Sequence, residues 1–308
     1  MNSRVLPTCL LLFFVVVVGC TPDNAAEPDQ ETAMNNGAKH TISLEGDFAG
    51  PIGLQLWSVR EHKTDDVAGR LARVYDMGFR EVELDGTHGM TPEAYGQLLD
   101  AAGLKATSLH AGYERFTNEL DAVLDEAEAL GVTYLGPAWI PHERGEPFTD
   151  AMARQAARDF NTWGAAAKAR GLQFFYHVHG YEYRTNADGT TPFDVLVAET
   201  DLDAVKYEMD VFWVAHSGTD PAALLREYPN RWVLMHVKDM KKGTPTPDYS
   251  GGATAEADVP IGTGQINYRA VLAAAREIGL DRYYIEDEST DPLGNIPRSI
   301  TFLETVTF

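Results

Sequence analysis

The chain has 308 residues, of which 46 are acidic and 25 are basic, so its formal net charge at pH 7 is −21. This charge argues against a nucleic-acid partner, because such binding depends on Lys and Arg side chains that neutralise phosphates. The two cysteines, Cys9 and Cys20, both lie near the start of the chain. The remainder therefore contains no intrachain disulfide and no thiolate metal site.

The first twenty residues, MNSRVLPTCLLLFFVVVVGC, have the pattern of an export signal, with one arginine, an apolar run and a small residue before Cys20. The end of this run, Val17-Val18-Gly19-Cys20, resembles the bacterial lipobox, in which the cysteine becomes lipidated. Ordinary secretion with cleavage elsewhere and a retained anchor are the alternatives.

This pattern predicts a lipoprotein signal peptide over residues 1–20 and a flexible tether over residues 21–40. We expect the mature protein to be exported and to touch a bacterial membrane only through its lipid anchor, facing the periplasm or the cell surface. Residues 41–308 are enough for one large catalytic domain.

Eight apolar runs typical of β-strands follow, and each precedes a stretch whose apolar residues recur at helical spacing. Several helical stretches begin with Asp or Thr at a capping position and end in Gly. The predicted strands are Ile52–Trp57, Glu81–Asp85, Lys105–His110, Thr133–Ala138, Leu172–His179, Ala204–Asp210, Trp232–Val237 and Tyr283–Asp287. The predicted helices cover residues 65–78, 91–103, 117–131, 150–171, 192–200, 220–230, 267–279 and 297–306.

Eight strand–helix pairs in one domain of this length predict an α/β fold, a (β/α)8 barrel. A doubly wound open sheet is the alternative, although it has no need of eight equivalent units.

Active sites of such barrels lie at the carboxyl ends of the strands, and in this sequence polar residues gather there. One histidine at a strand end is usually a core residue, but several strands share the feature. Imidazole and carboxylate ligands without sulfur suit a divalent cation such as Mn²⁺, Co²⁺, Mg²⁺ or Zn²⁺. The residues concerned are His110, His177, His179, Asp210, His236 and Glu286.

Four segments, YHVHGYEY, YEMDVFWVAHSGTDPAALL, MHVKDM and YYIEDES, resemble in this order the sugar phosphate isomerase/epimerase group of xylose isomerase-like TIM barrels. The likeness extends from GLQLWSVRE at Gly53 to RSITFLE near the end. It implies a metal bound by one residue each from strands five to eight, which in many relatives are Glu, Asp, His and Glu. Asp210, His236 and Glu286 match the last three.

Strand five departs from that pattern, because the chain has a histidine where many relatives have glutamate. His179 lies nearest the mouth by alternation and Glu182 supplies the carboxylate, so both are candidate metal ligands. We expect His177, one pleat deeper, to be chiefly structural and to border the substrate pocket.

The expected reaction begins with proton abstraction. A divalent ion that chelates adjacent carbonyl and hydroxyl oxygens of a sugar acidifies the carbon-bound proton between them and stabilises an ene-diolate. Glu182, Glu286 or Glu288 could move that proton, and Lys238 or His110 could hold the developing oxyanion. The alternative for Lys238 is a salt bridge with its neighbour, Asp239.

Aromatic residues at or just after strand ends suit a carbohydrate pocket, although each alone could simply be packing. Together with His110 and His177, they are the candidate substrate contacts: Trp57, Trp139, Trp213 and Tyr113. Trp213 stands where relatives with several metals carry another histidine, which argues against a multi-zinc site and a DNA-repair role.

The segment 240–260 is long and rich in Gly, Pro and Thr, which indicates a lid or a partner contact, with disorder as the alternative. The next segment, IGTGQIN, could cradle an anion or simply form a turn.

We expect a metal-dependent isomerase, epimerase or lyase that acts on a neutral keto-sugar or glycoside. The alternative is an exported carbohydrate-binding protein on a barrel that has lost catalysis.

Overall fold

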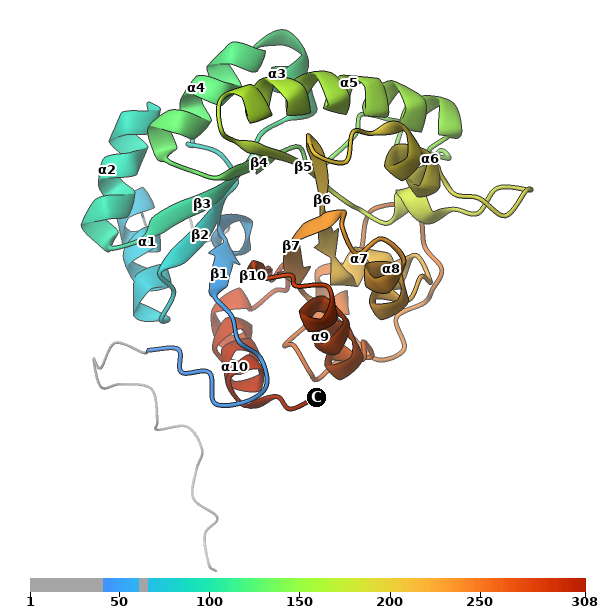
Figure 1. Ribbon diagram of the computed structural model, residues 1–308. Helices are drawn as coiled ribbons and strands as arrows, with labels where there is room; N and C mark the ends of the chain where they lie inside the picture. The colour runs from blue at the N-terminus through green and yellow to red at the C-terminus, as the bar shows by residue number, and fades with distance from the viewer. Residues whose placement is uncertain (1–40, 61–65) are drawn as a thin grey trace, which may run out of the picture. The chain divides into compact units, whose positions relative to one another are not determined.

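The computed structural model describes residues 41–60 and 66–308, and these described residues group as one compact unit. The predicted signal peptide, the tether and Cys20 lie outside the described residues. Eight parallel strands close into a barrel, and helices surround it (Figure 1). The predicted (β/α)8 barrel is therefore confirmed, and the open sheet is excluded by the pairing of β1 with both β10 and β2.

The order of strands around the barrel is β1-β10-β7-β6-β5-β4-β3-β2. Six of the eight barrel strands are one to three residues shorter than predicted, because backbone pairing covers less than the full apolar run. The barrel strands are β1 Ile52–Gln55, β2 Glu81–Leu84, β3 Lys105–His110, β4 Tyr134–Gly136, β5 Gln173–His177, β6 Val205–Asp210, β7 Trp232–Val237 and β10 Tyr283–Ile285.

Eight of the ten described helices begin after an Asp, Thr or Asn whose side chain caps the first turn, the exceptions being α3 and α4. Asp66 accepts from the Gly69 amide at 2.7 Å, and Thr191 forms a capping box with Asp194. The helices are α1 Val67–Asp76, α2 Pro92–Ala102, α3 Tyr113–Asn118, α4 Leu120–Leu130, α5 Asp150–Ala169, α6 Pro192–Glu199, α7 Val211–His216, α8 Pro221–Glu227, α9 Tyr268–Glu277 and α10 Pro292–Thr305. Two of these, α3 and α7, are short extra helices directly after strands, and the sequence analysis did not separate them.

Inside the barrel, an apolar layer lies beneath a polar one. Phe175, Leu234 and Tyr284 form a buried cluster on β5, β7 and β10. Two residues further along each chain segment come His177, His236 and Glu286, because side chains repeat on one face with a period of two. The strand periodicity thus places a ring of polar groups at the mouth.

After β7 the chain forms a small antiparallel pair, β8 Asp239–Met240 with β9 Asp258–Val259. The Asp239 carboxylate accepts from the amides of Gly262 and Gly264, both at 2.9 Å. The glycine turn that could have cradled an anion is therefore engaged by the protein's own carboxylate. Across 41–60 and 66–308, no helix combines the length and the apolar character that crossing a bilayer requires.

Candidate metal centre and sugar pocket

Three donor residues from β6, β7 and the end of β10 meet at the mouth. His236 Nδ1 lies 3.8 Å from Asp210 Oδ2 and 3.5 Å from Glu286 Oε2. His177 adds a fourth donor and a second nitrogen, with Nε2 3.8 Å from the same Asp210 oxygen. Asp210, His236 and Glu286 offer donor atoms within 4.8 Å of one another, and His177 extends this cluster through Asp210. Each of the four comes from a different one of four neighbouring segments of the barrel.

Two atoms of this cluster have no hydrogen-bond partner although they are buried, namely Asp210 Oδ2 and His236 Nδ1. The other oxygen of Asp210 caps α7 by accepting from the Trp213 amide at 3.0 Å. An unpartnered buried carboxylate oxygen beside an unpartnered imidazole nitrogen is costly unless a further group binds both. Nitrogen and oxygen donors without sulfur fit a divalent cation.

Glu208, on β6, lies below the cluster and contacts three histidines. It is fully buried and lies 2.9 Å from His110 Nε2, 2.9 Å from His177 Nδ1 and 3.2 Å from His236 Nε2. Burial raises the pKa of Glu208, but the three histidines outweigh burial and hold this pKa well below its usual value. The carboxylate orients His177 so that Nε2 faces Asp210.

Glu83, on β2, orients the ring of His236 as Glu208 orients that of His177. Its carboxylate is fully buried and lies 2.5 Å from His236 Nε2. Gln55 Nε2 and Ser108 Oγ donate to it at 2.7 Å and 2.5 Å. Such contacts fix the orientation of a ligating histidine and leave its other nitrogen, here Nδ1, for the metal.

Burial lowers the pKa of His236, but the carboxylates of Glu208 and Glu83 raise it well above its usual value overall. Burial raises the pKa of Asp210, and the nearby Glu286 adds to this effect. The surrounding carboxylates thus favour a protonated, positively charged His236. A metal cation bound there would supply the positive charge in place of that proton.

Lys238 is a buried cation at the edge of the cluster. Its ammonium donates to Glu286 Oε2 at 3.1 Å and also to Glu288. Burial lowers the pKa of Lys238, but Glu286 and Glu288 raise it well above its usual value. The alternative pairing with Asp239 is wrong, because that carboxylate accepts from backbone amides.

Two predicted strand-five ligands lie outside the cluster. In the described part of the chain, neither His179 nor Glu182 belongs to a set of histidine and carboxylate donors within 4.8 Å of one another. Glu182 is fully buried, accepts from the Tyr176 hydroxyl, and accepts from the His179 amide at 3.0 Å. The sequence alternation failed here because β5 ends at His177, and the chain then turns at Gly180, between His179 and Glu182.

Glu182→Gln is expected to change how stability depends on pH. Burial raises the pKa of Glu182 to about 7, above its unfolded value of 4.5. Above pH 7 the ionised Glu182 therefore lowers the free energy of unfolding by its full amount. This loss of stability disappears as the pH falls to 4.5 and the carboxyl becomes protonated. The wild type should gain roughly 3 kcal/mol relative to Glu182→Gln between pH 8 and pH 4.5.

Urea denaturation at both pH values measures this difference, with Glu93→Gln on the exposed surface of α2 as the control. A stability difference that does not change with pH would contradict the raised pKa of the buried Glu182 carboxyl.

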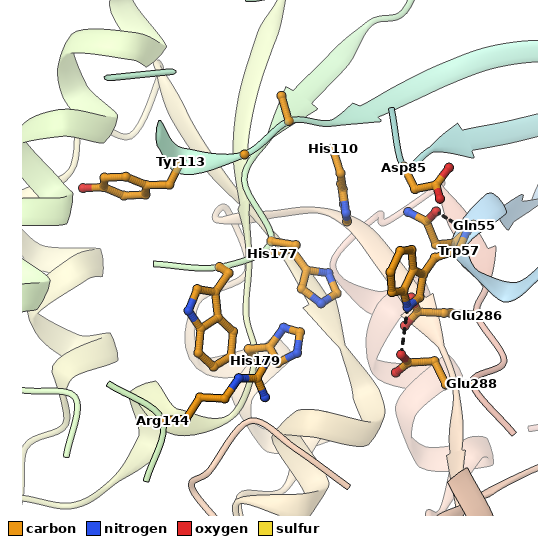
Figure 2. Close-up of a pocket in the computed structure, with 14 residues that line it drawn as sticks. Gln55, Trp57, Asp85, His110, Tyr113, Arg144, His177, His179, Glu286 and Glu288 are labelled. Atoms are coloured by element: carbon orange, nitrogen blue, oxygen red, sulfur yellow. Dashed lines mark hydrogen bonds between the residues drawn. The ribbon is translucent and has the colours of Figure 1, made fainter. Parts of the chain in front are cut away.

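A cavity of about 400 Å³ opens above the donor cluster. In Figure 2, His110, His177, His179 and Glu286 lie around this shared space. Trp57 borders the cavity and donates through Nε1 to Glu288 Oε1 at 3.0 Å. Trp139 and Tyr113 also line it, whereas Trp213 lines an adjoining chamber.

The sequence analysis missed Glu83, Glu208, Gln55 and Arg144. Glu83 and Glu208 lie within predicted strands. A carboxylate inside an apolar strand is rarely buried without a partner, and this pattern could have indicated them. Gln55 is the last residue of β1, but the predicted strand continued to Trp57, so Gln55 was not recognised as a strand end. Arg144 lies in the loop after β4, where no periodicity indicates which side chains reach the cavity.

Comparison with known proteins identifies a matching family and several curated relatives. A sequence profile described as "Xylose isomerase-like TIM barrel" matches residues 71–306. An inosose dehydratase of Lacticaseibacillus casei is 28% identical over 151 residues, which are 47% of this chain and 50% of the relative. The chain thus spans about half the length of the curated relatives it matches.

Solved structures share the fold. A sugar phosphate isomerase/epimerase from Parabacteroides distasonis has a TM-score of 0.69 at 24% identity and covers 86% of this chain and 98% of its own. The IolI protein, whose crystal structure holds a bound zinc atom, has a TM-score of 0.61 at 14% identity and covers 82% of this chain and 94% of its own.

Proposed function

Because the chain belongs to the xylose isomerase-like TIM barrel family, we propose that it is a divalent-metal-dependent enzyme that isomerises, epimerises or eliminates from a neutral keto-sugar or glycoside. The observation that carries this proposal is the pair of unpartnered buried atoms, Asp210 Oδ2 and His236 Nδ1, 3.8 Å apart at the mouth. The inosose dehydratases among the relatives support elimination as one of the three outcomes.

In this proposal His177, Asp210, His236 and Glu286 hold Mn²⁺, Co²⁺, Mg²⁺ or Zn²⁺. A divalent cation bound there would polarise adjacent sugar oxygens and lower the pKa of the carbon-bound proton between them. The zinc atom bound in the crystal structure of the IolI protein, which shares this fold, supports a metal-binding function.

The other groups of the pocket act on the substrate. Glu288 lines the cavity and is the carboxylate best placed to take and return a proton, because Glu286 is engaged in the donor cluster. The Lys238 ammonium stabilises negative charge that develops on a substrate oxygen. His110 and the rings of Trp57 and Trp139 border the sugar.

Solvent exchange tests the proposal. Metal-loaded protein is incubated in D₂O with a panel of keto-sugars and glycosides, and products are analysed by mass spectrometry. An isomerised or epimerised product is expected to carry deuterium on carbon, since the abstracted proton exchanges with solvent on its way back, whereas an elimination releases that proton and the leaving group to solvent. Isomerisation or epimerisation without deuterium on every active substrate would favour a hydride shift and contradict the proposed proton transfer.

Glu208→Gln is expected to weaken metal binding about 10–100-fold, since it removes the negative charge that orients His177 and His236. Competition with a chromophoric chelator measures the dissociation constant. Glu126→Gln is the matched control, because Glu126 is also a buried, ion-paired glutamate but lies on α4. Equal affinity in the wild type and both variants would contradict this role of Glu208.

We also propose that the protein is exported and anchored by a lipid on Cys20, on the strength of the sequence pattern alone. Cys20→Ser is expected to abolish incorporation of labelled palmitate and to release the protein from the membrane fraction. Unchanged labelling in Cys20→Ser, or no labelling of the wild type, would contradict the lipoprotein assignment.

A further inference from the structure

A second chamber of about 260 Å³ adjoins the cavity above the donor cluster. Three residues line both spaces, namely Arg144, His179 and Glu288. Two adjoining spaces, one over the cluster and one beside it, offer more room than a single ring above the donors would fill.

The long segment after β8, residues 241–257, covers the second chamber with its part from Gly251 to Ala255. Gly251 lies buried in this segment at a φ of 64°, and a Cβ there would come within 2.8 Å of the Trp139 ring. The segment therefore crosses the mouth from the β7 side and packs against a residue that follows β4. Because both ends are fixed by the β8–β9 pair, the chamber has a built wall.

The walls of the second chamber combine aromatic surface with hydrogen-bond donors. Phe212 and Trp213 line one side. The Arg144 guanidinium lies 4.6 Å from the centroid of the Trp139 ring. It has no carboxylate partner among residues 41–60 and 66–308, although the chain is strongly acidic. Apolar rings with a few fixed polar groups are the usual surroundings of a bound sugar.

We propose that this second chamber is a subsite for a second ring, so that the substrate is a glycoside of two joined units. One unit lies above the donor cluster, and the other lies beneath residues 241–257, with Arg144 donating to its oxygens. The linkage passes between His179 and Glu288. This inference rests on the proposed function and names its substrate class.

Gly252→Leu gives a direct test because it fills the chamber without straining the backbone. A Cβ on Gly252 would lie 3.7 Å from Arg144 Nη1, an ordinary contact, and its φ is not in the left-handed region. Gly96→Leu is the matched control, since no atom lies within 4 Å of a Cβ at that position on α2.

Binding of glucose, galactose, cellobiose, lactose and trehalose to the metal-loaded protein is measured by calorimetry. At least one disaccharide should bind about tenfold more tightly than either of its component monosaccharides. Gly252→Leu should remove that advantage and leave metal content and monosaccharide affinity unchanged, while Gly96→Leu should keep it.

Monosaccharides that bind as tightly as every disaccharide would overturn the subsite and leave the proposed function standing. So would a disaccharide advantage that persists in Gly252→Leu. Failure of every saccharide to bind a metal-loaded protein would count against the proposed function itself, and the subsite would fall with it.

Discussion

His236→Ala is expected to purify without the divalent cation proposed for the wild type and to lose about 10³-fold or more in kcat/KM, roughly 4 kcal/mol of transition-state stabilisation. The reason is that His236 contributes the central nitrogen of the cluster, with Asp210 and Glu286 both within 4 Å of Nδ1. Elemental analysis by mass spectrometry gives the metal content, and steady-state kinetics give the activity.

His216→Ala is the matched control, because His216 is also a buried histidine with an unpartnered Nδ1 but lies outside the donor cluster. It should retain metal. Equal trace metal in the wild type, His236→Ala and Asp210→Ala would contradict the enzyme proposal. That result would favour the alternative of a carbohydrate-binding protein on a barrel that has lost catalysis.

Lys238→Met is expected to keep the metal and lose about 10²–10³-fold in kcat. The variant removes a buried cation that competes for Glu286, so metal affinity should stay the same or rise. Lys206→Met is the matched control, since Lys206 is a half-buried lysine that donates to the Asn230 carbonyl away from the mouth.

Metal content, kcat and thermal unfolding are measured on both lysine variants, so that loss of folding is separated from loss of chemistry. A folded, metal-loaded Lys238→Met with wild-type kcat would contradict the catalytic role of Lys238. It would leave the ion pairs with Glu286 and Glu288 as its only function.

The barrel could be predicted because its signals are local. Apolar runs of strand length, helical stripes, capping residues such as Asp66 and Thr191, and glycines at helix ends all repeat along the chain. The short helix α7 escaped prediction because its start coincides with Asp210, which the sequence analysis used only as a strand end and which also caps the helix.

The donor cluster could be predicted in part. Asp210, His236 and Glu286 follow from strand ends and from the family resemblance. The strand-five donor could not, because alternation requires the strand to continue, whereas β5 stops at His177 and Gly180 turns the chain. Glu182 then turns toward Tyr176, a contact that depends on tertiary packing.

The carboxylates beneath the cluster were beyond sequence reasoning for a different reason. Glu83 and Glu208 are stable when buried because side chains from other strands meet them: histidines in both cases, and also Gln55 and Ser108 at Glu83. Their role therefore depends on the closure of the barrel. The second chamber likewise depends on the path of residues 241–257, which no periodicity encodes.

The most direct test of the central assignment is a crystal structure of the protein grown with Mn²⁺, with anomalous differences recorded to locate the ion. The assignment requires one strong peak bonded to His177, Asp210, His236 and Glu286. A peak bonded to His179 or Glu182 instead, or no peak at the mouth of the barrel, would contradict it.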